Sequence, residues 1–125
     1  MILDTTAVSD FFEGNAAVTA ILGKASAIHL PVIVLGEYRY GLLGSKRQKT
    51  ITPRLDALAA ASQILVVDEE TTNYYAAIAH ELKKVGQPIP LNDLWIAALA
   101  RQHALPVLTR DAHFDRVPGL HRITW

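Results

Sequence analysis

Asp93 and Asp111 flank the most apolar part of this chain of 125 residues. Asp93 directly precedes a run of seven apolar residues, 94–100, and Asp111 follows a short apolar strand candidate. A helix that is apolar on all sides belongs in a protein interior. We predict that Asn92 caps this helix and that Asp93 lies in its first turn, where the helix dipole favours a negative charge. Asp93 alone is explained as a stabiliser of the helix end, so the question is whether other acids reach the same place.

Two more acids are expected there. Asp4 ends the short apolar run 1–3, and Glu37 lies in the second turn of a helix that is predicted to begin near Pro31. Right-handed crossovers between parallel strands put the carboxyl ends of the strands at one edge of the sheet, where such folds bind ligands. Each acid alone is explained as a cap, a turn residue or an exposed helix acid. Together the four predict a cluster of carboxylates at one edge.

Closely packed carboxylates repel each other and raise each other's pKa, a conflict that a divalent cation relieves. The chain has no cysteine, and oxygen ligands favour Mg²⁺ or Mn²⁺ over zinc. A metal held by carboxylates activates a water and stabilises an in-line phosphoryl displacement, so the residues favour metal-assisted phosphodiester hydrolysis. The histidines show no metal-ligand spacing and are interpreted as surface or partly buried residues: His29, His80, His103, His113 and His121.

Short strands alternate with helices along the whole chain. Strand candidates lie at 1–3, 27–30, 64–67, 106–109 and 122–125, and helices are predicted to begin near Thr5, Asn15, Pro31, Thr52, Asp68 and Asn92. This alternation is typical of an α/β fold with a mainly parallel sheet covered on both faces. The length suits a single domain, residues 1–125, with a core of its own.

Composition narrows the classes of protein further. Half of the residues are hydrophobic, which excludes a disordered chain, and the absence of cysteine suits a reducing cytoplasm. We find no signal-peptide pattern and no apolar run of membrane-spanning length, so no membrane partner is expected. The formal net charge of zero counts mildly against a nucleic-acid substrate. The densest basic cluster is either a local nucleic-acid patch or a solvated connection between helices: Lys46, Arg47 and Lys49, with Arg54 nearby.

Four motifs in this order make the sequence resemble the PIN-domain nucleases, and most closely the VapC-type toxins of bacterial toxin–antitoxin pairs. They are Leu3-Asp4-Thr5, Gly36-Glu37, Asn92-Asp93-Leu94-Trp95-Ile96-Ala97-Ala98 and Leu108-Thr109-Arg110-Asp111-Ala112-His113-Phe114. The last two are specific as a pair, and the first two are weak alone. The resemblance implies a three-layer α/β/α sandwich with a central parallel sheet. It also implies an endoribonuclease that depends on Mg²⁺ or Mn²⁺, an antitoxin that docks on it and blocks the site, and a homodimer.

Carried over by position, the resemblance assigns an acidic metal site to Asp4, Glu37, Asp93 and Asp111. Asp115 is a candidate fifth acid, because in a helical turn it would share a face with Asp111, four residues earlier. Thr5 and Thr109 are expected to orient the carboxylates or their waters, with simple capping as the alternative. Arg110 is either a contact to a substrate phosphate or a solvated side chain.

Two other classes of protein remain open. A receiver-like signalling domain shares the length, the α/β fold and an acidic Mg²⁺ site, but it would want adjacent acids where Asp4 is followed by Thr5-Thr6. A non-catalytic partner-binding domain would use its acids only as caps, and Asp93→Asn would then leave its stability and metal response nearly unchanged. The aromatic residues of the early helices are interpreted as core, or else as a dimer face or antitoxin groove: Phe11, Phe12, Tyr38 and Tyr40.

Overall fold

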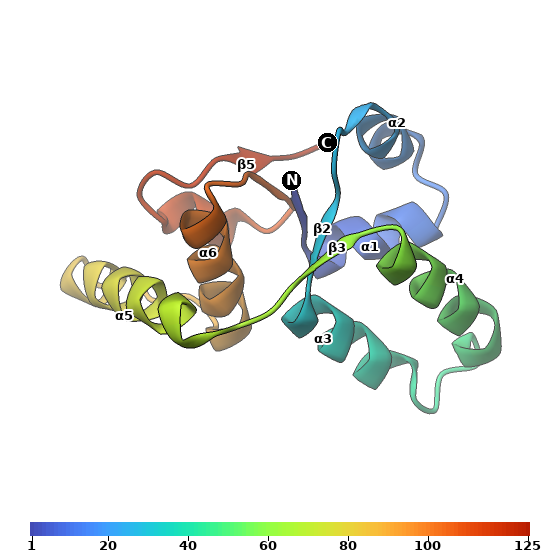
Figure 1. Cartoon of the computed structure of the whole chain (residues 1–125), viewed down its shortest axis with the longest axis horizontal. Coiled ribbons are helices and arrows are strands. Elements are labelled where there is room, and N and C mark those ends of the chain that lie inside the picture. Colours follow the sequence, from blue (N-terminus) through green and yellow to red (C-terminus); the bar gives the residue numbers. More distant parts are fainter.

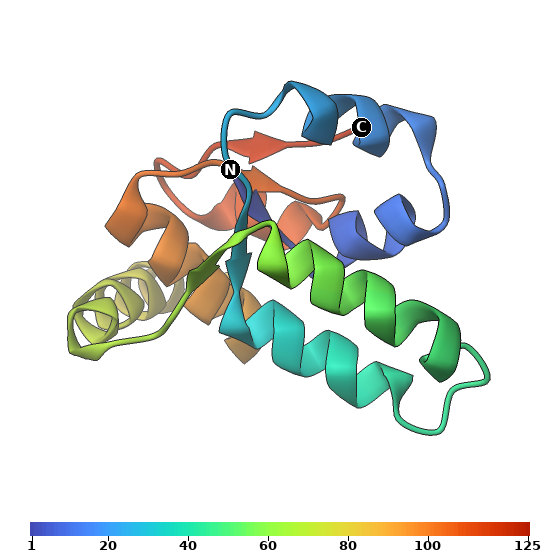
Figure 2. The same ribbon diagram turned by 45° about the vertical axis from the view of Figure 1, so that its right-hand side comes forward.

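A five-stranded, all-parallel sheet runs through the centre of the computed structural model, which describes all residues 1–125. The strand order is β3-β2-β1-β4-β5, and every neighbouring pair is parallel (Figures 1 and 2). The strands are short: β1 Ile2–Leu3, β2 His29–Pro31, β3 Gln63–Leu65, β4 Val107–Leu108 and β5 Arg122–Ile123. The predicted parallel sheet is therefore confirmed, with β1 at its centre.

Six α-helices and one 3₁₀ helix surround this sheet. They are α1 Thr5–Phe12, α2 Ala16–Lys24, α3 Val32–Leu42, α4 Gln48–Ala60, α5 Glu69–Lys84, α6 Leu91–His103 and η1 Ala112–Arg116. Successive side chains of a strand point to opposite faces of its sheet, and both Ile2 and Leu3 of β1 are fully buried. Helices therefore cover both faces of the sheet, as the three-layer architecture requires. Figure 1 shows α3 and α4 on one side of the strands and α5 and α6 on the other.

Helix α6 is the buried helix that the sequence predicts. Every residue from Leu94 to Ala100 is buried except Trp95, which is partly exposed and stacks on Tyr75 of α5 with ring centroids 4.0 Å apart. The burial of α6 on nearly all sides holds its first turn, and with it Asp93, at a fixed place beside the sheet. No helix in the structure combines the length and the apolar character that crossing a lipid bilayer requires.

One predicted helix cap and one predicted helix start are wrong. Helix α6 begins at Leu91, and the cap position is Pro90, so Asn92 lies inside the first turn and caps nothing. Proline is already restrained near the backbone angle that a helix entry needs, which lets it take this place. Helix α4 begins at Gln48 and contains Pro53, where the sequence suggested a start near Thr52. That expectation followed the preference of proline for the first turn of a helix, which the packing of α4 overrides here.

Strand β3 ends at Leu65, earlier than the predicted run to Val67. Pro31 of β2 pairs with Leu65, but it has no N–H to donate, and the chain turns into α3 immediately afterwards. Without a neighbouring strand, Val66 and Val67 leave the sheet and are exposed. The β-branched run therefore reports strand propensity but not the end of the pairing.

Most of the early aromatic residues belong to the core. Phe12 is buried, and its ring meets Tyr38 edge-on with centroids 5.6 Å apart, while Phe11 packs beside it at 5.7 Å. Tyr40 differs, because 80% of its surface is exposed. The core interpretation therefore holds for three of these residues, and Tyr40 is left on the surface of α3.

Candidate functional site

Four acids lie at the carboxyl edge of the sheet, each placed by a different element. Asp4 directly follows β1, and its backbone N–H donates to the carbonyl of Leu108 at 3.2 Å, which extends the pairing of β1 with β4. Asp111 lies just beyond β4 and accepts from the N–H of His113 at 2.9 Å, which caps η1. Asp93 comes from the first turn of α6, and Glu37 comes from the second turn of α3.

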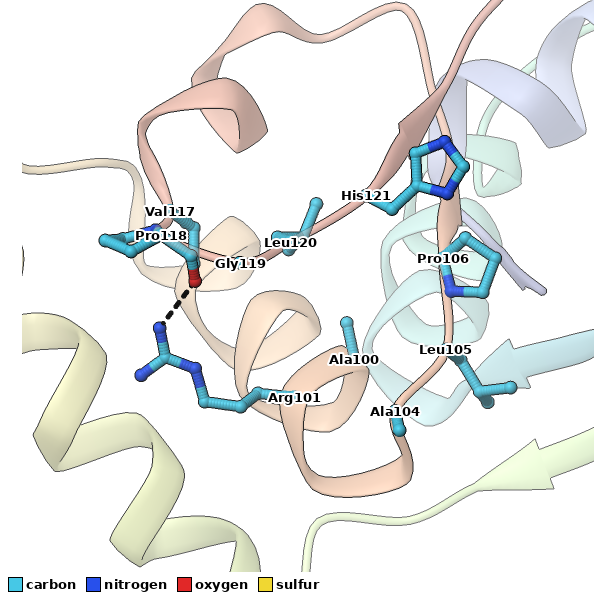
Figure 3. Close-up of a pocket in the computed structure, with 10 residues that line it drawn as sticks. All are labelled: Ala100, Arg101, Ala104, Leu105, Pro106, Val117, Pro118, Gly119, Leu120 and His121. Atoms are coloured by element: carbon cyan, nitrogen blue, oxygen red, sulfur yellow. Dashed lines mark hydrogen bonds between the residues drawn. The ribbon is translucent and has the colours of Figure 1, made fainter.

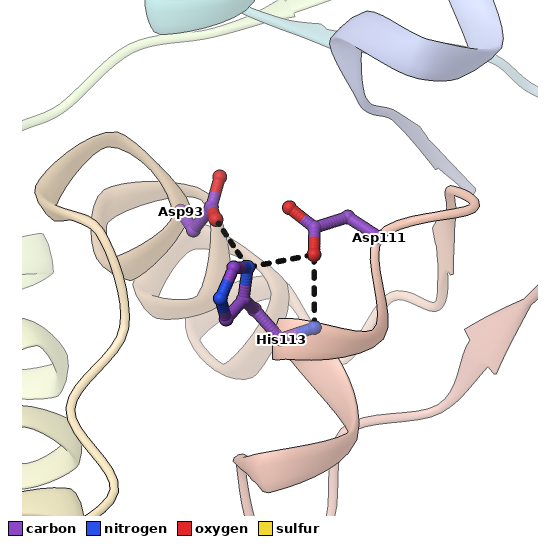
Figure 4. Close-up of side chains that lie close together, drawn as sticks. All are labelled: Asp93, Asp111 and His113. Carbon is purple, nitrogen blue, oxygen red and sulfur yellow. Dashed lines mark hydrogen bonds and ion pairs between the residues drawn. The ribbon is translucent and has the colours of Figure 1, made fainter.

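Three side chains at this edge lie close enough together to hold a metal ion. One ligand atom each from Asp93, Asp111 and His113 lies within 4.8 Å of the other two. His113 Nδ1 lies 2.8 Å from Asp111 Oδ1 and 3.7 Å from Asp93 Oδ2, between the two carboxylates (Figure 4). Although part of the ring is exposed, this nitrogen is buried, and its contacts lack the geometry of a hydrogen bond. A buried nitrogen without a hydrogen-bond partner, beside two carboxylates, suits a divalent cation.

His113 is partly buried, as expected of the histidines, but it belongs to this group although the histidines show no metal-ligand spacing in the sequence. Its actual partner is Asp111, two residues earlier, and the 3₁₀ turn that Asp111 caps brings the two side chains together. The available signal was an aspartate followed two residues later by a histidine, directly after a strand.

The acids of the cluster perturb one another. Burial and the neighbouring charges of Asp111 and Asp4 together raise the pKa of Asp93 to about 7, while His113 opposes them. Burial also raises the pKa of Asp4, against the hydrogen bond from Thr109, with smaller contributions from Asp111 and Glu37. Like charges gathered in a partly desolvated place disfavour ionisation, and a cation would reverse this effect.

The hydroxyl groups of Thr109 and Thr6 form a chain of hydrogen bonds that ends at the carboxylate of Asp4. Thr109 Oγ1 donates to Asp4 Oδ2 at 2.6 Å and accepts from the N–H of Asp111 at 2.9 Å. Because the only hydroxyl proton of Thr109 is used on Asp4, the 3.2 Å contact with Thr6 requires that Thr6 be the donor. Thr6 in turn accepts from the N–H of Arg110 at 3.1 Å. Every proton in this chain points toward the carboxylate, so the bonds reinforce each other.

The orienting role predicted for Thr109 corresponds to its hydrogen bond to Asp4. Thr6 takes part in the same chain of hydrogen bonds and was not predicted. Thr109 is fully buried and Asp4 is almost so. Thr5, the other predicted orienting residue, donates to Glu37 Oε1 at 3.4 Å and so links α1 to α3 at the same edge. Nothing in the sequence distinguishes Thr6 from a capping residue, because its partners lie more than a hundred positions away.

Two predicted residues are directed elsewhere. The carboxylate of Asp115 faces the guanidinium of Arg122, which donates to both oxygens at 2.8 and 2.9 Å. The turn is 3₁₀ and not α-helical, so residues four apart do not share a face and Asp115 does not join Asp111. Arg110 donates to Asp10 at 3.1 Å and lies over the ring of Trp125, so its guanidinium is not free toward the cluster.

A hollow lies at the opposite edge of the sheet, away from the four acids. It has a volume of about 420 Å³ and is lined where α6 ends and where β4 and β5 begin (Figure 3). Arg101 is the main charged group there, and it is engaged with Glu81 and with the carbonyl of Pro118. This hollow contains no group of potential metal ligands, and the one such group in the structure lies at the carboxyl edge.

Comparisons with known proteins agree with this geometry. The model of the family described as PIN domain matches residues 1–120. Ribonuclease VapC5 of Mycobacterium tuberculosis is 34% identical over 90 residues, 70% of this chain and 67% of its own length. Ribonuclease VapC2 of Rickettsia felis is 32% identical over 106 residues, covering 84% and 79%. Toxin FitB of Neisseria gonorrhoeae is 34% identical over 121 residues, covering 89% and 87%.

Solved structures resemble the whole chain. A crystal structure of VapBC2 from Rickettsia felis, bound to a DNA fragment from its promoter, has a TM-score of 0.89 and 28% identity, and covers 99% of this chain and 97% of its own. The structure of FitAcB from Neisseria gonorrhoeae has a TM-score of 0.86 and 30% identity, and covers 98% and 95%.

Proposed function

We propose, since this chain belongs to the PIN domain family, that it is a metal-dependent endoribonuclease and the toxin of a toxin–antitoxin pair. The observation that carries the proposal is the convergence of Asp93, Asp111 and His113 within 4.8 Å at the carboxyl edge of the sheet. Relatives with the same fold are named ribonucleases, and this convergence gives the chain a place where the hydrolysis of a phosphodiester can occur.

We assign the metal ligands to Asp93, Asp111 and His113, with Asp4 and Glu37 completing the acidic cluster. The donor set, mostly hard carboxylate oxygens, favours Mg²⁺ or Mn²⁺. When bound in such a place, a divalent cation lowers the pKa of water and offsets the negative charge of an in-line displacement at phosphorus. The carboxylates need to be ionised to act as ligands, so Asp93 would have to lose its proton for a cation to be held near neutral pH.

The remaining contacts keep the acidic cluster in position. Thr109 donates to one oxygen of Asp4 and so fixes the orientation of this carboxylate. Thr5 holds Glu37 at the rim, and the N–H of His113 fixes one oxygen of Asp111. These three carboxylates therefore have a preset direction before metal or RNA arrives, which reduces the reorganisation that the reaction needs.

We assign the chain an antitoxin as its protein partner, because a 26% identical structure with the same fold, from Mycobacterium tuberculosis, is described as a member of the VapBC family of toxin–antitoxin systems. We further propose that the toxin is a homodimer and that RNA is its substrate.

The proposal is tested by RNA cleavage in Mn²⁺ or Mg²⁺, with Asp93→Asn as the inactive variant. Asp115→Asn is the matched control, since Asp115 is an exposed aspartate that pairs with Arg122 and lies outside the cluster. We expect Asp93→Asn to lower cleavage by about a hundredfold or more, as the loss of a ligand should, and Asp115→Asn to keep it. Cleavage that persists in excess EDTA, or that both variants retain, would refute the metal mechanism.

A further inference from the structure

A second, smaller hollow begins at the acidic cluster itself. It has a volume of about 270 Å³ and lies between α1, α3 and the segment that leads into α4. Thr5 and Glu37 line the end at the acidic cluster, while Ser45 and Arg47 line it on the segment between α3 and α4. The hollow therefore connects the candidate metal site with the densest basic cluster of the sequence.

Most cations of this basic cluster make few stabilising contacts within the protein. Lys46 and Lys49 are exposed and form no ion pair. Arg54 differs, since it donates to the carbonyl of Phe12 at 3.0 Å and lies over that ring. Arg47, which lines the hollow, has one charged partner, the carboxylate of Glu13.

The pair between Arg47 and Glu13 is easily exchanged. The side chains are 53% and 61% exposed, and ion pairs exposed to this extent contribute little to stability. The carboxylate of Glu13 occupies a donor edge of the guanidinium that equally suits a phosphate. Ser45 Oγ accepts from the N–H of Arg47 at 3.1 Å, which leaves its own proton available for an oxygen of the same ligand.

We propose, on the basis of the proposed ribonuclease function, that this hollow is a nucleotide subsite for single-stranded RNA. Arg47 and Ser45 bind a phosphate that neighbours the one to be cleaved beside Glu37, and Glu13 competes with that phosphate for Arg47. The apolar wall for the sugar and base comes from Tyr38, Leu42 and Ile51. The hollow has room for part of a single strand but not for a duplex, in keeping with recognition of unpaired RNA.

The test measures binding of a fluorescein-labelled, mixed-sequence single-stranded RNA of about ten nucleotides by anisotropy in EDTA, where no cleavage is expected. Arg47→Gln should weaken binding about tenfold and reduce the slope of log K against log salt by about 0.7, the share of one phosphate contact. Glu13→Gln should tighten binding several-fold, because it removes the competing carboxylate. Arg39→Gln is the matched control, since Arg39 forms a similarly exposed pair with Asp56 at 3.0 Å outside the hollow.

A double variant separates a specific pair from a general charge effect. If Glu13 acts only through Arg47, the gain from Glu13→Gln disappears when Arg47→Gln is also present. A gain that persists in the double variant, or equal losses for Arg47→Gln and Arg39→Gln, would overturn the subsite. A parent that cleaves RNA while Arg47→Gln binds normally would refute the subsite and leave the nuclease standing. A parent that neither binds nor cleaves RNA would refute both.

Discussion

The two edges of the sheet differ in both shape and charge. The amino edge holds a hollow of about 420 Å³, but its main charged group, Arg101, is matched by Glu81 and a carbonyl. The carboxyl edge gathers acids that are not matched by cations, together with a buried histidine nitrogen that lacks a hydrogen bond. In this molecule, therefore, the site is identified by an unresolved electrostatic conflict among carboxylates and not by the volume of a hollow.

The largest expected effect on stability comes from relieving that conflict. In EDTA at pH 8, Asp93→Asn should raise the free energy of unfolding, because the folded parent has to ionise a carboxyl whose pKa is raised to about 7. A pKa shift of this size corresponds to a destabilisation of at most about 4 kcal/mol, and screening by solvent at the rim reduces this destabilisation to about 2 kcal/mol. Thermal or urea unfolding measures the difference.

The same comparison has a defined pH dependence. Between about pH 4 and 7, folded Asp93 keeps a proton that the unfolded chain has lost, so the stability of the parent falls as pH rises through this range. The advantage of Asp93→Asn should therefore vanish near pH 4. Asp115→Asn should act in the opposite direction, because it removes a partner of Arg122. An advantage that is the same at pH 4 and pH 8 would show that Asp93 is not in conflict with its neighbours.

A smaller effect tests whether the hydroxyl chain prepares Asp4 for a cation. Thr6→Val removes the donor to Thr109 and the acceptor for Arg110, and should weaken Mn²⁺ binding about tenfold by calorimetry without RNA. Thr6→Ser should restore most of the affinity, because it keeps the hydroxyl. The control is Thr19→Val, where the lost hydroxyl only contacts the carbonyl of Asn15. Equal affinities for Thr6→Val and the parent would reduce Thr6 to a local structural contact.

The smallest effect is expected at the amino edge. Arg101→Gln loses the contacts to Glu81 and to the carbonyl of Pro118, and should lower the free energy of unfolding by about 1 kcal/mol. Cleavage of RNA at a temperature well below unfolding should not change. A large loss of cleavage in this variant would contradict the division of the molecule into a chemical edge and a structural edge.

Much of the fold was predictable from the sequence, because it rests on local patterns. The apolar run from Leu94 to Ala100 indicated a buried helix, and short strands between helices indicated a parallel sheet. Element ends were less predictable, since they depend on partners. Strand β3 stops where Pro31 offers no N–H, and α4 begins before Pro53 because packing outweighs the preference of proline for a first turn.

The candidate site shows the same division. The four core acids were named because each follows or opens an apolar element, and the structure places them at one edge of the sheet. His113 and Thr6 were missed, because their importance comes from partners brought close by a 3₁₀ turn and by the pairing of β1 with β4. Asp115 was included through an α-helical spacing that the 3₁₀ turn does not have.

The central position of β1 also has a consequence for the order in which the protein is made. Asp4 leaves the ribosome well before its partner Thr109, which follows 105 positions later, after β2, β3, β4 and all six α-helices. Contacts so distant in sequence close late in folding. A nascent chain that has reached the end of α5 contains Asp4 and Glu37 but lacks Asp93, Asp111 and His113. During synthesis the growing chain therefore lacks a complete acidic cluster until α6 and η1 have been made.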